Sequence, residues 1–163
     1  MVIKHFFLLL LMCLVFAGCV NQTITPHPTR IASEHSASTN IASTNLAFAE
    51  QYLAHIKQQP GIQTTSTGLA YRVLKTGYGC KPTNDSAITI YYQAQVANGM
   101  KIIDSNYAKG RPDTFPLNRM IAAWREALPM MAEGSQWELY TPPHLAYGHK
   151  GAGRDVPPNA AMV

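Results

Sequence analysis

The chain has 163 residues, of which 47% are hydrophobic, and a formal net charge of +4. This length allows one domain with a substantial core and some additional segments. The positive charges form no dense basic run, which gives little support to nucleic acid as a partner. The 3 cysteines include no Cys-x-x-Cys pair, so we expect neither a disulfide framework nor a cysteine-based metal or redox centre.

Residues 1–18 have the pattern of a secretory signal peptide. Lys4 and His5 precede an apolar run, and Ala17 and Gly18 stand directly before Cys19. The run is shorter than the ~20 apolar residues that span a bilayer. The Ala-Gly-Cys ending resembles a bacterial lipobox, which predicts a lipid on Cys19. No Asp follows this cysteine, which favours the outer membrane, with the domain facing the periplasm or the cell surface. Ordinary cleavage after Ala17 is the alternative and would leave a soluble periplasmic protein.

The segment after the signal peptide predicts a flexible tether over 19–44. It consists largely of Thr, Ser, Ala, Asn and His and is interrupted by Pro26 and Pro28, a composition that buries little apolar surface. A short helix is predicted over 45–60, ended by Pro60 and Gly61. Its apolar residues recur at helical spacing: Leu46, Ala49, Leu53 and Ile56.

The pattern from residue 62 to residue 163 predicts an α+β domain in which an antiparallel β-sheet wraps around one short α-helix. Strands are expected over 69–74 and 87–96, and in the second strand apolar residues alternate, so that Tyr92 points inward. Asn98-Gly99 is typical of a hairpin turn. The helix is predicted from the apolar face that Ile121, Trp124 and Leu128 share.

Conventional catalytic motifs are missing from the sequence. It contains no Gly-x-Ser-x-Gly, no His-Glu-x-x-His and no phosphate-binding loop. His144 and His149 could suggest a metal pair, but no third ligand stands nearby, and a solvated loop is the simpler interpretation. We therefore expect neither a metal site nor a cofactor.

Several motifs occur in one order in the second half of the chain. They are Ile88 to Ala94, Asn98-Gly99, Ile103-Asp104-Ser105, Met120 to Leu128, Gly134 to Tyr140, Leu145 to Gly148 and Val156 to Ala160. This order and spacing resembles the FKBP-type peptidyl-prolyl cis/trans isomerases, in particular the bacterial lipoprotein form of the macrophage infectivity potentiator (Mip) type. The resemblance implies an isomerase that assists the folding of exported proteins. It would rotate Xaa-Pro amides over a barrier of ~18–20 kcal/mol in an apolar pocket, without covalent catalysis.

The resemblance also assigns roles to individual residues. The catalytic positions would be Asp104 near the twisting carbonyl, Tyr147 donating its hydroxyl to a carbonyl, and Ile121 donating its backbone N–H. The substrate pocket would be formed by Tyr92, Ile103, Phe115, Met120, Trp124 and Val156. Taken singly, Trp124 and Tyr92 are as easily core aromatics, and Ile103 stands where the family usually has an aromatic residue.

The family pattern continues beyond Ala160 with an apolar strand, so this domain is expected to be incomplete, with its last strand missing. Two alternatives follow: a degenerate module that binds proline-containing segments without turnover, and an inactive truncated fragment. The expected partners are unfolded or exported polypeptides that contain proline, the membrane through the lipid anchor, and macrolide ligands of immunophilins. Because the N-terminal helix is expected to be short, we also expect a monomer.

Overall fold

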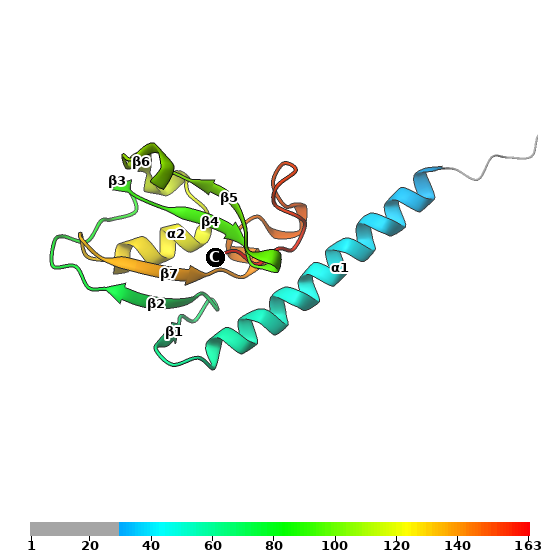
Figure 1. Ribbon diagram of the computed structural model, residues 1–163, viewed down its shortest axis with the longest axis horizontal. Coiled ribbons are helices and arrows are strands. Elements are labelled where there is room, and N and C mark those ends of the chain that lie inside the picture. The colour runs from blue at the N-terminus through cyan, green and yellow to red at the C-terminus, as the bar shows by residue number, and fades with distance from the viewer. Residues whose placement is uncertain (1–29) are drawn as a thin grey trace, which may run out of the picture.

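The computed structural model describes residues 30–163, with side chains from residue 39 onward. The expected signal peptide, Cys19 and the first part of the expected tether lie outside the described residues. The described part has a long helix at its N-terminal end, followed by a domain of short antiparallel strands and one short helix (Figure 1). The expected α+β architecture is therefore confirmed.

Helix α1 (Arg30–Lys57) is longer than the sequence predicted. It includes residues 30–44, so the expectation of a flexible tether is wrong for this stretch. Two hydrogen bonds to distant residues attach the middle of the helix to the domain, and the local composition does not predict them. Asn45 Nδ2 donates to Pro158 O at 2.9 Å, and Asn159 Nδ2 donates to Ala42 O at 3.0 Å. Within the helix, the Ser43 and Thr44 hydroxyls donate to Asn40 O at 2.9 and 2.8 Å. Both hydroxyls therefore bond to a carbonyl of the same helix. They do not bond to backbone groups in a way that would favour a non-helical conformation.

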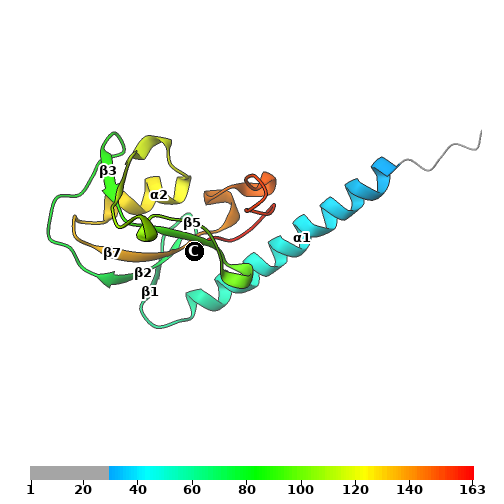
Figure 2. The same ribbon diagram turned by 45° about the horizontal axis from the view of Figure 1, so that its top comes forward.

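The length of α1 also removes the reason for expecting a monomer, which stays a prediction. The N-terminal part of the helix extends away from the domain, as two views of the molecule agree (Figures 1 and 2). Among residues 30–163, no helix is long and apolar enough to cross a membrane.

The C-terminal part of α1 packs on the domain through small and aromatic side chains. Ala49 and Leu53 are buried against Ala70, Ala97, Tyr140 and Ala161. Tyr52 lies between Phe48 and Tyr140, with ring centroids 5.9 and 6.5 Å away. Gly61, with φ of 78°, follows the helix and turns the chain into the first strand.

Between residues 30 and 163, seven strands form three antiparallel groups. A three-stranded sheet has the order β1 (Ile62–Thr64), β2 (Ala70–Lys75) and β7 (Gln136–Tyr140). Strand β3 (Ala87–Ile90) pairs with β6 (Asp113–Pro116). Strand β4 (Gln93–Val96) pairs with β5 (Lys101–Ser105), and a turn at Asn98–Met100 joins them, as the hairpin motif predicted.

The strand expected over 87–96 is thus divided at Tyr91 and Tyr92, where the chain changes its pairing partner from β6 to β5. The alternation still holds across the break. Ile88 and Val96 are buried, Tyr92 is half-buried, and Tyr91 is exposed.

Helix α2 (Ala122–Ala127) lies inside the curve of the strands (Figure 1). Its small residues Ala123 and Ala127 are fully buried and pack with Leu69 and Leu145. This close packing brings the helix against the sheet and presents its opposite side to β3 and β6. Pro129 has no N–H to continue the α-helical ladder, and the chain goes on as a 3₁₀ turn, Leu128–Met130.

Residues 161–163 lie between β4 and the end of β7. The backbones of Val163 and Gln95 exchange hydrogen bonds of 2.8 and 2.9 Å, and those of Met162 and Thr141 exchange bonds of 2.8 and 3.0 Å. Met162 therefore bridges antiparallel to both Val96 and Thr141. The expectation of a further strand after these residues stays a prediction.

Candidate active site

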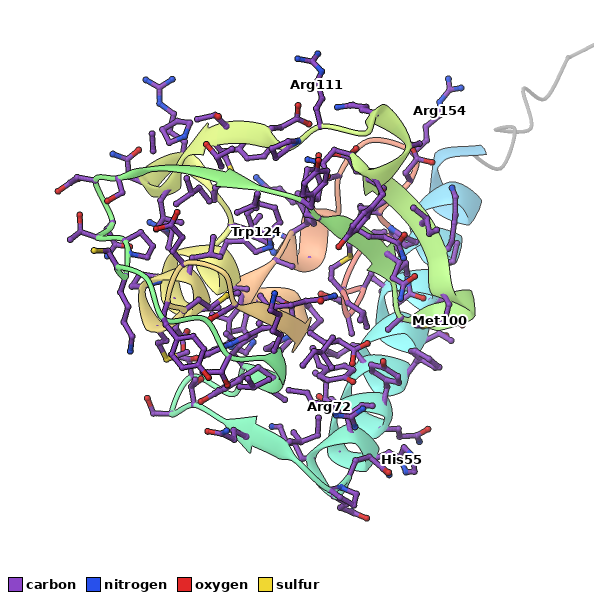
Figure 3. All side chains as sticks on the ribbon, turned by 60° about the vertical axis from the view of Figure 1, so that its left-hand side comes forward. His55, Arg72, Met100, Arg111, Trp124 and Arg154 are labelled. Atoms are coloured by element: carbon purple, nitrogen blue, oxygen red, sulfur yellow. The ribbon has the colours of Figure 1, made fainter. Side chains whose placement is uncertain are left out.

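Three aromatic rings, each from a different element, meet edge to face. Trp124 comes from α2, Phe115 from β6, and Tyr92 from the break between β3 and β4. The Tyr92 ring centroid lies 5.4 Å from that of Trp124 and 5.7 Å from that of Phe115, and the planes are tilted by 78° and 76°. Phe115 and Trp124 are 6.2 Å apart at 74°. Such T-shaped contacts stabilise rings beyond the burial of their area, so the rings form a defined apolar wall. Trp124 lies inside the domain, whereas Arg111 and Arg154 point outward (Figure 3).

A polar pair lies beside this wall. The Tyr92 hydroxyl donates to Asp104 Oδ2 at 2.5 Å. Desolvation by burial, together with the hydrogen bond to Asp104, raises the pKa of Tyr92 to about 12. The phenol therefore stays protonated and keeps donating, and one carboxylate oxygen of the exposed Asp104 is held in a fixed position on β5.

Two hydrogen-bond donors, from Ile121 and Tyr147, have no partner within residues 39–163. Ile121 precedes α2 as its N-cap residue, with φ of −58° and ψ of 155°. Its carbonyl accepts from Trp124 N–H and Arg125 N–H, while its own N–H makes no hydrogen bond within residues 39–163. The Tyr147 hydroxyl likewise has no hydrogen-bond partner in this part of the chain, and its side chain is 39% exposed. Both groups are free to donate to an incoming carbonyl.

The structure brings most of the predicted site residues to one cavity of about 1190 Å³. Those that line it are Tyr92, Ile103, Asp104, Phe115, Met120, Ile121, Trp124 and Tyr147. The volume exceeds that of an ordinary ligand pocket because the cavity continues along β4 and β7 as far as Val163.

Val156 lies apart from the cavity lining. It is 5% exposed and packs with Val96, Ala160 and Met162, while Ile103 covers this cluster from the cavity side. The backbones of Ala152 and Val156 pair with each other at 2.9 and 3.1 Å, which turns Val156 inward. In this arrangement Val156 supports a pocket residue and does not itself form the wall, contrary to the sequence-based expectation.

Sequence reasoning missed Asn106. Its side chain is fully buried and bonds to the backbone of Ile90 and Tyr92. A polar residue shortly after Asp104 is typical of a turn, and nothing local in the sequence predicts burial there.

The site offers shape, apolar surface and hydrogen bonds. Within residues 39–163, no group of three His, Cys, Asp or Glu side chains is placed to hold a metal ion. A free backbone donor, a free hydroxyl and a fixed carboxylate around an aromatic wall suit the binding of an extended peptide with an apolar ring at its centre.

Comparison with known proteins agrees with this geometry. Residues 79–163 match the family model described as "FKBP-type peptidyl-prolyl cis-trans isomerase". The chain belongs to this family. Residues 20–73, which include all of α1, match the model "Domain amino terminal to FKBP-type peptidyl-prolyl isomerase".

Two curated relatives and one solved structure are informative. The chain is 41% identical over 119 residues to "Peptidyl-prolyl cis-trans isomerase Mip" of Coxiella burnetii, covering 73% of this chain and 51% of that protein. It is 34% identical over 122 residues to "Outer membrane protein MIP" of Legionella longbeachae, covering 75% and 52%. The crystal structure of FkpA from Escherichia coli matches with a TM-score of 0.76 at 31% identity, covering 81% of this chain and 61% of that one. The chain thus spans about half the length of these curated relatives.

Proposed function

We propose that this protein is a peptidyl-prolyl cis/trans isomerase that acts on exported polypeptides as they fold. The observation that carries the proposal is a pair of donors without partners in residues 39–163, Ile121 N–H and the Tyr147 hydroxyl, in the lining of an aromatic cavity that also includes Asp104. Both donors line the same cavity as the aromatic rings and Asp104, and both are accessible from solvent, so a peptide bound in the cavity can accept from them.

The proposed mechanism is rotation without bond cleavage. A substrate proline rests against Trp124, and the two free donors bind substrate carbonyl oxygens. Twisting the Xaa-Pro amide removes its resonance, and the twisted form is less polar than the planar one, so an apolar surrounding binds it better. Asp104, held by Tyr92, places a carboxylate oxygen near the carbonyl carbon side of the twisting amide. No nucleophile, metal or cofactor is needed for this step.

The test is a protease-free exchange measurement by NMR on Xaa-Pro peptides with the chain and two variants. Tyr147→Phe removes only a hydroxyl that has no partner among residues 39–163, so stability should not change while kcat/KM falls. Removing one donor that acts in the transition state costs about 2–4 kcal/mol in favourable cases. Asp104→Ala should also lower kcat/KM. Peptide binding without any acceleration by the unchanged chain would instead support a binding module.

For localisation, we propose export by residues 1–18, lipid attachment at Cys19 and residence in the outer membrane. The Ala17-Gly18-Cys19 motif supports this proposal, and so does a relative named as an outer membrane protein. Labelled palmitate should enter the protein in a bacterial host, and Cys19→Ser should abolish labelling and release the chain from membranes. A mature N-terminus at Gly18 in mass spectrometry would establish a soluble periplasmic form.

A further inference from the structure

Asn106 is the largest fully buried polar side chain in the described part of the chain. Its Oδ1 accepts the N–H of Tyr92 at 2.9 Å, and its Nδ2 donates to the carbonyl of Ile90 at 2.9 Å. Its own backbone N–H donates to Tyr92 O at 3.2 Å. One residue therefore contacts three backbone groups on either side of Tyr91.

These hydrogen bonds lie at a point in the chain where neither strand pairing supplies a backbone partner. Ile90 is the last residue of β3 paired with β6, and Gln93 is the first residue of β4 paired with β5. The intervening residues belong to neither ladder. A backbone donor and acceptor left unpaired in a buried position would be costly, and the Asn106 amide supplies both complements. Only one orientation of the amide fits, because the Tyr92 N–H requires an oxygen and the Ile90 carbonyl requires an N–H.

The backbone fixed in this way carries the Tyr92 side chain, which has three contacts within the site. Tyr92 contacts Trp124 and Phe115 edge to face and donates to Asp104. Asn106 also follows Asp104 by two positions, directly after the end of β5. Asn106 is thus linked through the chain to the residue that carries the carboxylate, and by hydrogen bonds to the backbone of the tyrosine whose hydroxyl holds that carboxylate.

We propose that Asn106 is a positioning residue for isomerisation: by clamping the backbone at Tyr92, it aligns the Tyr92 hydroxyl with Asp104. The inference rests on the proposed function. The inference goes beyond the proposed function because it assigns a role in turnover to a residue that does not line the cavity.

Two variants test the clamp. Asn106→Ala removes both side-chain bonds. Asn106→Asp keeps an oxygen for the Tyr92 N–H, but at neutral pH its carboxylate cannot donate to Ile90 O. That carboxylate would lie close to Asp113, whose pKa is held below its usual value by Lys109, at 2.9 Å, and also by Asn106 and Arg111. Protonation at acidic pH restores the missing donor, so the activity of Asn106→Asp should recover relative to the unchanged chain as the pH falls.

At neutral pH we expect kcat/KM per folded molecule to fall by roughly 10- to 100-fold in both variants, as for a misplaced catalytic group. NMR of ring-labelled tyrosine should show the pKa of Tyr92 falling from about 12 toward its ordinary value of 10.0. A Leu53 truncation of similar stability is the control, because Leu53 lies in the separate cluster under α1. It should change neither readout.

Wild-type kcat/KM with an unchanged Tyr92 titration in both variants would overturn the proposal, and so would lost activity with an unchanged titration. If Asn106→Ala does not fold, the pH-dependent recovery of Asn106→Asp decides. If the unchanged chain shows no isomerase activity, the proposed function fails, and the Tyr92 titration still decides whether Asn106 holds the phenol.

Discussion

The polar groups of the site divide into two kinds, and the division suggests what each does. The Tyr92 hydroxyl is hydrogen-bonded to Asp104 at 2.5 Å, so the two side chains are already in position before a peptide binds. Ile121 N–H and the Tyr147 hydroxyl have no partners in residues 39–163, so they remain available to a ligand. A site that needs little rearrangement on binding loses little entropy when it acts.

The Tyr92 phenol should also make stability depend on pH in the alkaline range. Its pKa is raised, by burial first and by Asp104 second, to about 12 in the folded protein, against an ordinary value of 10.0. A raised folded pKa contributes stability that is fully present below the unfolded pKa and is lost as pH rises through the folded one. We expect the free energy of unfolding to fall from pH ~10 to ~12.

Urea unfolding at several alkaline pH values measures this slope. Tyr140 shares the behaviour, because burial and a 2.6 Å bond to Glu138 raise its pKa to about 12. Tyr92→Phe and Tyr140→Phe should each flatten the slope, and the double variant should flatten it further. An identical slope in the unchanged chain and the double variant would contradict the burial of these phenols.

At the scale of elements, sequence patterns correctly predicted the features that depend on neighbouring residues, such as which side chains of a strand point inward. Alternation over 87–96 placed Tyr92 inward correctly, because side chains on a strand alternate whatever the strand pairs with. The break at Tyr91 and Tyr92 depends on Asn106, 14 residues further on, and no local pattern contains it. The helix around Ala42 was missed for the same reason, since Asn159 stands 117 residues from its partner Ala42. The site residues came from the family resemblance, which could not show that Val156 turns into the core.

Helix α1 gives a prediction at this scale. Leu53 is 6% exposed and packs into the cluster with Ala70 and Tyr140, whereas Ile41 on the same helix is 54% exposed. Leu53→Ala should lower the free energy of unfolding by about 2–5 kcal/mol, because it leaves a cavity. Ile41→Ala should change it by less than ~0.5 kcal/mol. Urea unfolding followed by circular dichroism compares them, and equally small effects would mean that α1 is not docked in solution.

At the scale of the whole molecule, Met162 joins two parts of the domain. Its backbone bonds to Thr141, directly after β7. Its neighbour Val163 bonds to Gln95 within β4, and its neighbour Ala161 bonds to Ala97, directly after β4. The three-stranded sheet and the β4–β5 pair share no other strand ladder in the described residues. Cooperative unfolding of the two parts therefore depends strongly on this short segment.

The two tryptophans of the chain report on different contacts near this junction: Trp137 lies in β7, and Trp124 contacts Tyr92, which directly precedes β4. Met162→Pro removes the N–H that donates to Thr141 O at 3.0 Å, and the unsatisfied carbonyl should cost about 1–3 kcal/mol. In Trp124→Phe the fluorescence reports on Trp137, and in Trp137→Phe it reports on Trp124.

The urea unfolding transitions of these two variants should coincide when Met162 is present. When Met162→Pro is added, the Trp137 and Trp124 signals should change at different urea concentrations. Met162→Leu conserves volume and the N–H, so its transitions should still coincide. Coincident transitions in Met162→Pro would show that the side-chain core alone couples the two parts.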